Sequence, residues 1–169
     1  MGKIKRVFDG KLLKVFVKKE RLPNGFVATF EIVKHPGAAL MIPFLKKNKI
    51  IMLRQLRPVI GSYIYELPAG TLGVNERPLA CARREIIEET GYAASRFTFL
   101  GSIYPVPGYS TERIYIYRAE GLKAVERAAE EDEVIEPLVF TRMQVKRLFR
   151  HGKIVDAKTI CALAMCGWL

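Results

Sequence analysis

The stretch GTLGVNERPLACARREIIEETGY, residues 70–92, decides the fold of this 169-residue chain. Its second half is typical of one helix, because Pro78 suits a first helical turn and Gly91 suits a left-handed C-terminal cap. We therefore predict a helix that begins near Asn75 and ends before Gly91. The apolar stripe that this helix should bury consists of Leu79, Ala82 and Ile86.

Three carboxylates lie on one face of this predicted helix, because Glu85, Glu88 and Glu89 stand at i, i+3 and i+4. Like charges at this spacing raise one another's pKa, so the cluster needs basic partners, solvent or a divalent cation to stay ionised. Carboxylate oxygens suit Mg²⁺ or Mn²⁺. An exposed acidic face paired with Arg83 and Arg84 is the alternative, and the spacing by itself does not decide between them.

The wider pattern resembles the 23-residue Nudix box: Gly70, five residues, Glu76, seven residues, then residues 84–92. Tyr92 departs from it, standing where relatives carry an aliphatic residue, and residues 71–75 lack the acidic and glycine residues often found there. The resemblance implies an α/β fold of the α+β type, the Nudix fold. In that fold a mixed central β-sheet is sandwiched between helices, here with an N-terminal antiparallel strand extension.

The same resemblance implies roles for residues of the box. Glu85 and Glu89 would bind metal, Glu88 would assist, and the backbone carbonyl of Ala69 would complete the shell. The implied structural partners are Arg84 and Glu76. The expected cation is Mg²⁺, with Mn²⁺ as a substitute, because a divalent ion can neutralise a diphosphate, orient it and acidify an attacking water.

The flanks resemble ADP-ribose pyrophosphatases, from about Gln55 to the C-terminus. The similar segments are residues 55–57, residues 65–70 and Pro107. By this similarity Arg57 would contact the phosphates through paired guanidinium donors, and Glu66 and Glu112 would lie near the metal or ribose. The implied substrate-binding set is Arg57, Glu66, Pro107 and Glu112. Taken singly, Arg57 could be a surface arginine and Pro107 an ordinary turn.

A general base is expected outside the box. Residues 129–135 form an acidic stretch that resembles the loop from which this subfamily brings in a catalytic glutamate. Composition alone favours a solvated loop instead. Two alignments are possible, and we favour Glu131 as the base and Glu133 as a metal or water ligand.

The hydrophobic pattern divides the chain in two. Residues 1–36 are expected to form an N-terminal β-strand region whose strands, by resemblance, cross to a second subunit, and residues 37–169 should form the Nudix domain. We predict a turn at residues 23–25 and a polar hairpin turn at residues 46–48. The strands are predicted near residues 11–17, 26–33, 39–45, 49–56, 97–103, 113–117 and 135–140.

Two further helices should run from about Met143 to Arg150 and onward from Asp156, which is a good N-cap. The second of these should turn Ile160, Leu163, Ala164 and Trp168 toward the core. Residues 152–159 resemble the start of the subfamily's C-terminal helix, which implies a packing role and no catalysis by Lys158.

Composition and charge limit the kinds of molecule that this protein is expected to bind. The formal net charge is +11, and a basic cluster spans residues 142–153. We interpret it as a solvated helix face and not as a nucleic-acid surface, because aromatic residues do not alternate with the basic ones as a single-strand binding platform would require. Cys81, Cys161 and Cys166 form no CxxC pair and are expected to be buried thiols in a reducing cytoplasm. No segment resembles a signal peptide or reaches the length of a membrane helix, so we expect a soluble protein.

We therefore expect Mg²⁺-dependent hydrolysis of the diphosphate bond of a nucleoside diphosphate sugar, with ADP-ribose cut to AMP and ribose 5-phosphate. Alternative Nudix substrates are GDP-mannose, NADH and oxidised nucleotides. A non-catalytic basic nucleic-acid-binding module is the alternative from another class. The nucleobase, the number of metal ions and the attacked phosphorus stay open.

Overall fold

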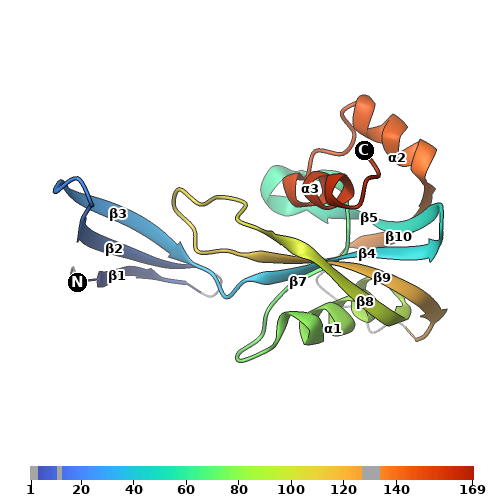
Figure 1. The fold of residues 1–169 in the computed structure, drawn as a ribbon, viewed down its shortest axis with the longest axis horizontal. Coiled ribbons are helices and arrows are strands. Elements are labelled where there is room, and N and C mark those ends of the chain that lie inside the picture. The colour runs from blue at the N-terminus through green and yellow to red at the C-terminus, as the bar shows by residue number, and fades with distance from the viewer. Residues whose placement is uncertain (1–3, 11–12, 127–133) are drawn as a thin grey trace.

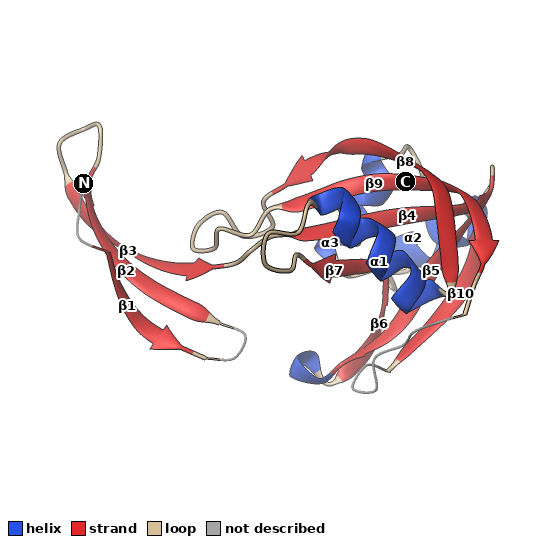
Figure 2. Ribbon diagram, turned by 90° about the horizontal axis from the view of Figure 1, so that it is seen from below, coloured by secondary structure: helices blue, strands red, loops and turns tan. Residues whose placement is uncertain are grey.

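The computed structural model describes residues 4–10, 13–126 and 134–169. Strands β1 (Ile4–Asp9), β2 (Lys14–Arg21) and β3 (Val27–Lys34) form a three-stranded antiparallel sheet. Figure 2 shows this sheet projecting away from the rest of the molecule. The predicted N-terminal antiparallel extension is present, although the sequence pattern did not predict β1.

A larger mixed sheet forms the body of the molecule. Its strands are β4 (Ala38–Lys46), β5 (Lys49–Arg57), β6 (Ser62–Glu66), β7 (Ala69–Thr71), β8 (Tyr92–Ile103), β9 (Ile114–Ala124) and β10 (Ile135–Thr141). The main path is β10-β5-β4-β9-β8, with β6 on β5 and β7 on β4. Strands β4 and β9 are parallel, whereas β4 and β5 pair antiparallel as the hairpin turn at residues 46–48 predicted. The sequence pattern did not predict β6 and β7.

Helices cover both faces of this sheet (Figure 1). Helix α1 (Pro78–Thr90) lies on one face, and α2 (Arg142–Arg150) and α3 (Ala157–Met165) lie on the other. Side chains on β4 alternate between the two layers. Leu40 and Ile42 belong to the core under α2 and α3, and Ala39 and Met41 belong to the core under α1. The predicted fold class, a mixed sheet between helices, is confirmed.

The structure corrects several details of the predicted helices. Helix α1 begins at Pro78 and not near Asn75, because Asn75 has a positive φ of 59° in the preceding turn. Leu79 is exposed, and Cys81 joins Ala82 and Ile86 on the buried face. In α3 the prediction was wrong for Ala164, which is exposed, and right for Leu163, which is buried. Gly91 caps α1 in the left-handed region, as predicted.

The structure agrees with some of the expectations about the cysteines and the basic cluster and contradicts one of them. Cys81 is buried, Cys166 is half-buried and Cys161 is exposed, so the expectation of three buried thiols was wrong for Cys161. Arg147 and Arg150 are exposed on α2, in keeping with the predicted solvated basic face. None of the helices in the described ranges is long and apolar enough to cross a membrane.

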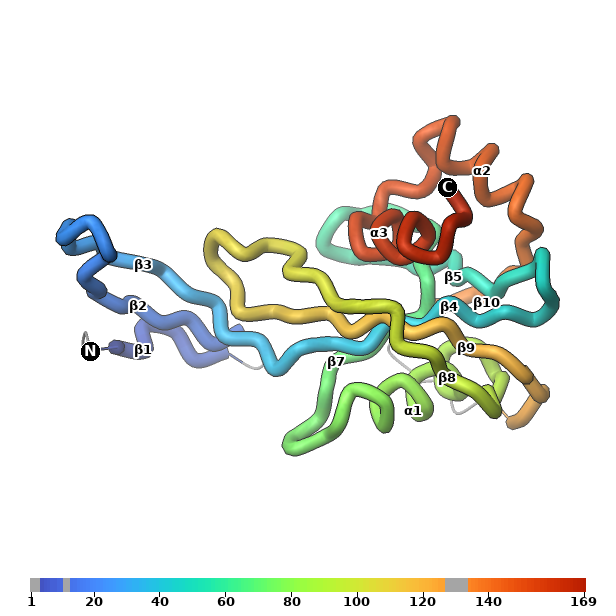
Figure 3. The backbone as a smooth tube through the Cα atoms, in the orientation of Figure 1, coloured from blue at the N-terminus to red at the C-terminus, as the bar shows by residue number. Residues whose placement is uncertain are grey.

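The segment that joins β8 to β9 connects the two sheets. Val33 at the end of β3 donates its backbone N–H to the carbonyl of Tyr109, and its own carbonyl accepts from the N–H of Thr111. The Thr111 hydroxyl accepts from the N–H of His35. Figure 3 shows this segment beside the chain that leaves β3. The base of the small sheet is therefore attached to a segment that also reaches the pocket described next.

Candidate active site

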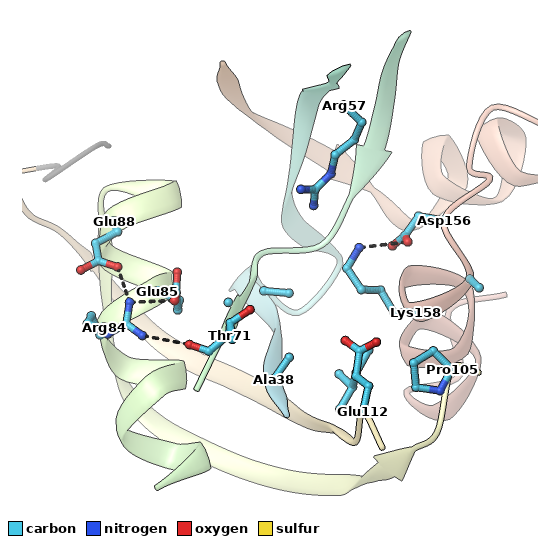
Figure 4. Close-up of a pocket in the computed structure, with 14 residues that line it drawn as sticks. Ala38, Arg57, Thr71, Arg84, Glu85, Glu88, Pro105, Glu112, Asp156 and Lys158 are labelled. Carbon is cyan, nitrogen blue, oxygen red and sulfur yellow. Dashed lines mark hydrogen bonds and ion pairs between the residues drawn. The ribbon is translucent and has the colours of Figure 1, made fainter. Parts of the chain in front are cut away.

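A pocket of about 630 Å³ opens where both helical layers approach the edge of the large sheet. Its lining comes from the start of β4, the end of β5, β7, α1, the segment before β9 and the start of α3. Figure 4 shows the carboxylates of α1 on one side and Lys158 with Asp156 on the other. The residues predicted from the sequence that line it are Arg57, Ala69, Glu85, Glu88 and Glu112.

We call Glu85, Glu88 and Glu89 of α1 the acidic wall, in which Glu85 and Glu88 line one side of the pocket and Glu89 is buried. Arg84 lies among the carboxylates, with its guanidinium 2.7 Å from Glu85 and 2.8 Å from Glu88. It also pairs with Glu76 at 3.1 Å. One cation thus serves three carboxylates, and the implied structural role of Arg84 and Glu76 agrees with these contacts.

These contacts shift the pKa values of both Arg84 and Glu76. Hydrogen bonding to Glu76 is the main cause that raises the pKa of Arg84 above its ordinary value. Arg84 and the N–H of Gly73 in turn hold the pKa of the Glu76 carboxyl below its usual value. The ionic network under the acidic wall is therefore maintained at neutral pH.

The start of strand β7, residues 69–70, lies directly against the acidic wall. The N–H of Ala69 donates to Glu89 at 2.8 Å, and Glu89 is buried. A Cβ on Gly70 would come within 1.8 Å of the Glu85 carboxyl group. Glycine at position 70 lets the backbone approach this carboxylate, and any side chain there would force the end of Glu85 to move.

Cys81 lies against the same strand, and its thiol donates to the carbonyl of Gly70 at 3.4 Å. Burial, followed by the charge of Glu85, raises the pKa of this thiol to about 12. A thiol with this pKa is protonated at neutral pH and is no nucleophile. Cys81 is therefore a packing residue beneath the site.

The donor set of the acidic wall fits a hard divalent cation. It offers carboxylate and backbone oxygens, which are the ligands that Mg²⁺ and Mn²⁺ prefer. Within residues 4–10, 13–126 and 134–169, no group of three or more His, Cys, Asp or Glu side chains is arranged to hold a metal ion. Glu85 and Glu88 nevertheless both line the pocket. One or two carboxylates together with substrate phosphates are a usual way to bind Mg²⁺.

The opposite side is the basic wall, which we define as Arg57 and Lys158. The Arg57 guanidinium pairs with Glu66 at 2.5 Å, and the Lys158 ammonium lies 3.2 Å from the other oxygen of Glu66. Lys158 also pairs with Asp156 at 2.9 Å. Burial opposes the charge on Arg57, but the hydrogen bond to Glu66 and the charges of Glu66, Glu89 and Asp156 together outweigh burial and raise the pKa of Arg57. Glu66 is thus a buried partner of these cations and not a residue that lines the pocket.

Sequence reasoning gave residues 152–159 a packing role and so missed Lys158, which lines the pocket. Part of that expectation holds, because Asp156 caps α3 and the Thr159 hydroxyl accepts from the N–H of Leu67. One signal was present in the sequence. A lysine in the first turn of a helix opposes the helix dipole, so its presence there suggests another use.

The other predicted residues are distributed as follows. Glu112 lies across the pocket, with Oε1 3.9 Å from Nδ1 of His35. Pro107 lines a second pocket of about 290 Å³ against β2 and β3, and Pro105 takes a place in the first pocket. Glu131 and Glu133 lie outside the described residues.

Comparison with known proteins adds independent information. A family model described as the NUDIX domain matches residues 34–162. An ADP-ribose pyrophosphatase of Bacillus subtilis (strain 168) is 38% identical over 160 residues, which cover 94% of this chain and 86% of that protein. A methanol dehydrogenase activator of Bacillus methanolicus is 37% identical over 163 residues, covering 95% of this chain and 88% of that protein.

Solved structures give a similar picture. A crystal structure of an ADP compounds hydrolase matches with a TM-score of 0.84 and 21% identity, covering 97% of this chain and 89% of that one. At this level of identity the likeness shows the fold alone. It spans the small N-terminal sheet as well as the body, because nearly the whole chain is covered.

Proposed function

The chain belongs to the NUDIX family of hydrolases, and from that premise we propose that it cuts the diphosphate bond of ADP-ribose to give AMP and ribose 5-phosphate. The observation that carries the proposal is the pairing of the two walls across one pocket, carboxylates of α1 on one side and Arg57 on the other. A diphosphate accompanied by a divalent cation presents the two complementary charges. The name of the Bacillus subtilis relative supports ADP-ribose within this class.

The chain's own residues divide the work as follows. Glu85, Glu88, Glu89 and the carbonyl of Ala69 would hold the cation, for which we propose Mg²⁺ with Mn²⁺ as a substitute. When bound, the cation supplies Lewis-acid stabilisation to the phosphate oxygens. Arg57 would donate paired N–H groups to the same diphosphate, and Glu112, which lines the same pocket, would contact the ribose or the cation shell.

A base must accept the proton of the attacking water. We keep Glu131 as this base and Glu133 as its neighbour, on the strength of the sequence resemblance alone. A base contributes roughly 10²- to 10⁴-fold to rate with little effect on binding. Glu131→Gln should therefore lower kcat by that order at nearly constant KM. Near-normal kcat in both Glu131→Gln and Glu133→Gln would move the search to Glu88.

We also propose that residues 1–36 form a homodimer contact. The small sheet leaves many apolar side chains exposed, namely Ile4, Val7, Phe8, Leu13, Phe26, Val27 and Phe30. An exposed apolar set of this size is typical of a surface that another chain covers. Light scattering after gel filtration should give twice the 19.2 kDa chain mass, and a monomer mass at micromolar concentration would refute the contact.

We propose the cytoplasm as the compartment, because the chain has no CxxC pair.

The substrate proposal is tested with a panel of ADP-ribose, GDP-mannose and NADH in Mg²⁺, with products identified by mass. We expect the highest kcat/KM for ADP-ribose and the products AMP and ribose 5-phosphate. A higher kcat/KM for GDP-mannose or NADH would overturn the substrate and leave the family standing. Glu85→Gln, which keeps the size of the side chain and removes its charge, serves as the control for contaminating hydrolases.

A further inference from the structure

In the basic wall two cations pair with the single buried carboxylate of Glu66, although one cation would balance its charge. The Glu66 side chain is 3% exposed, and a buried carboxylate needs a cationic or hydrogen-bonding partner. Arg57 meets that need through two nitrogens, with Nη2 at 2.5 Å and Nε at 3.1 Å from the same oxygen. Lys158 adds a second cation on the other oxygen at 3.2 Å. Two cations are thus held by one buried anion.

Both cations reach the pocket, whereas their shared partner does not. The side chains of Arg57 and Lys158 are 39% and 18% exposed, and both line the cavity. Asp156 also lines the cavity, but one of its oxygens caps the N–H of Thr159 and the other receives Lys158. The anion therefore lies behind the wall, and the charge presented to a ligand is positive at both Arg57 and Lys158.

Each cation keeps donors for a ligand. An ammonium group has three protons, and within the described ranges Lys158 gives one to Glu66 and one to Asp156. A guanidinium has five N–H groups, and the contacts of Arg57 to Glu66 involve only Nε and Nη2. Because the two cations bind the same carboxylate, they lie close enough for adjacent phosphates of one ligand to reach both.

The helix dipole does not favour Lys158 at its position, which is held by ion pairs with Asp156 and Glu66. It is the second residue of α3, at the positive end of the helix dipole, where a cation is unfavourable. The same helix end favours a bound anion. The cost to the helix is explained if the lysine serves a negatively charged ligand.

We propose that Lys158 is a second diphosphate-contacting residue of this pocket, and that Glu66 is the positioning residue that holds Lys158 and Arg57 for it. The proposal deepens the proposed function, on which it rests for the diphosphate class of ligand, and it does not depend on the nucleoside or the sugar. Glu66 acts through the two cations and contacts no substrate.

Inorganic pyrophosphate is the probe, and calorimetry measures its dissociation constant with and without Mg²⁺. Lys158→Gln should weaken binding roughly 10- to 100-fold, the range for one hydrogen bond to a charged group. Lys158→Arg should recover most of the affinity. The matched control is Lys153→Gln, because Lys153 is an exposed lysine five residues earlier that does not line the pocket. It should bind like the wild type.

Glu66→Gln keeps the shape of the buried side chain and removes the charge that holds both cations. We expect it to weaken pyrophosphate binding as well, whereas a role of Glu66 confined to folding would lower Tm and leave the affinity of the folded protein unchanged. An unchanged pyrophosphate affinity in Lys158→Gln would overturn the proposal, whether or not its Tm falls.

A second measurement uses only wild-type protein, so it stands even if Lys158→Gln does not fold. Lysines are acetylated with a limiting amount of reagent and quantified by mass spectrometry. Pyrophosphate should protect Lys158 and leave Lys153 unprotected, and equal labelling of Lys158 with and without the probe would contradict the proposal. If the wild type binds pyrophosphate through Lys158 but does not cut ADP-ribose, only the substrate proposed above has failed.

Discussion

The two walls of the pocket carry side chains of opposite charge. On the acidic wall one cation, Arg84, pairs with Glu76, Glu85 and Glu88. On the basic wall one buried anion, Glu66, pairs with Arg57 and Lys158. The two walls therefore gather carboxylates on one side of the pocket and cations on the other. Such an arrangement suits a ligand that brings the complementary charges, a cation on one side and a diphosphate on the other.

The walls also differ in how the chain assembles them. The acidic wall and Arg84 come from one helix and its preceding turn, so helical geometry places them. The basic wall depends on the β5–β6 pairing, in which Leu53 faces Glu66 and Arg57 faces Ser62, and on α3 packed nearby. The acidic wall should therefore tolerate changes to distant segments that the basic wall does not.

The largest loss of activity should come from Glu85→Gln, which removes one negative charge from the acidic wall and keeps the size of the side chain. Glu85 would act through the cation, and weakening a cation that stabilises the reacting phosphate should lower kcat by about 10²- to 10³-fold, the range for loss of one such stabilising contact. Arg84 keeps Glu76 and Glu88, so the fold should persist. Steady-state kinetics and a thermal melt check both statements, and a protein that unfolds without metal would show Glu85 to be structural.

A smaller loss is expected for Gly70→Ala, which leaves every charge in place. The new Cβ would meet the Glu85 carboxyl group, so the flexible end of that side chain must move aside. A misplacement of about 1 Å can cost up to ~10²-fold in rate. Little stability should be lost, because the displaced atoms are the end of a flexible side chain. Unchanged kcat would mean that the position of Glu85 does not matter.

Arg57→Ala should act on the other wall and change KM more than kcat. A phosphate contact made in both ground and transition states contributes mainly uniform binding, and we expect KM to rise roughly 10- to 100-fold. Arg57→Lys is the matched control, since it keeps a charge for Glu66 without the paired donors. A fall in kcat at constant KM would place Arg57 in the chemical step.

The contrast between the walls also explains what could be predicted from the sequence. The role of Gly91 follows from the local pattern, those of Glu76 and Arg84 follow from the resemblance of the box, and the structure agrees with both. The interpretation of Glu66 was incomplete, because the sequence does not reveal that it lies behind the cavity between Arg57 and Lys158. Such long-range neighbours depend on strand register and on helix packing, for which one sequence carries no local signal.

Short strands were missed for a related reason. Strand β7 has only the residues Ala69–Thr71, too few to display an alternating pattern, and it exists because β4 supplies its hydrogen-bonding partner. Leu79 was placed in the core by its apolar character, yet the helix begins later than predicted and turns Cys81 inward instead. In each case tertiary packing decided the outcome.

The central claim is that the two walls bind different ligands, and paired titrations test it most directly. Mn²⁺ binding, followed by electron paramagnetic resonance without phosphate, and pyrophosphate binding without metal are measured for wild type, Glu85→Gln and Lys158→Gln. Glu85→Gln should weaken Mn²⁺ at least about tenfold and leave pyrophosphate unchanged or tighter, because it removes a negative charge. Lys158→Gln should weaken pyrophosphate and leave Mn²⁺ unchanged or tighter. A contrary result, in which either substitution weakens both ligands equally, would show that the pocket has no separate walls.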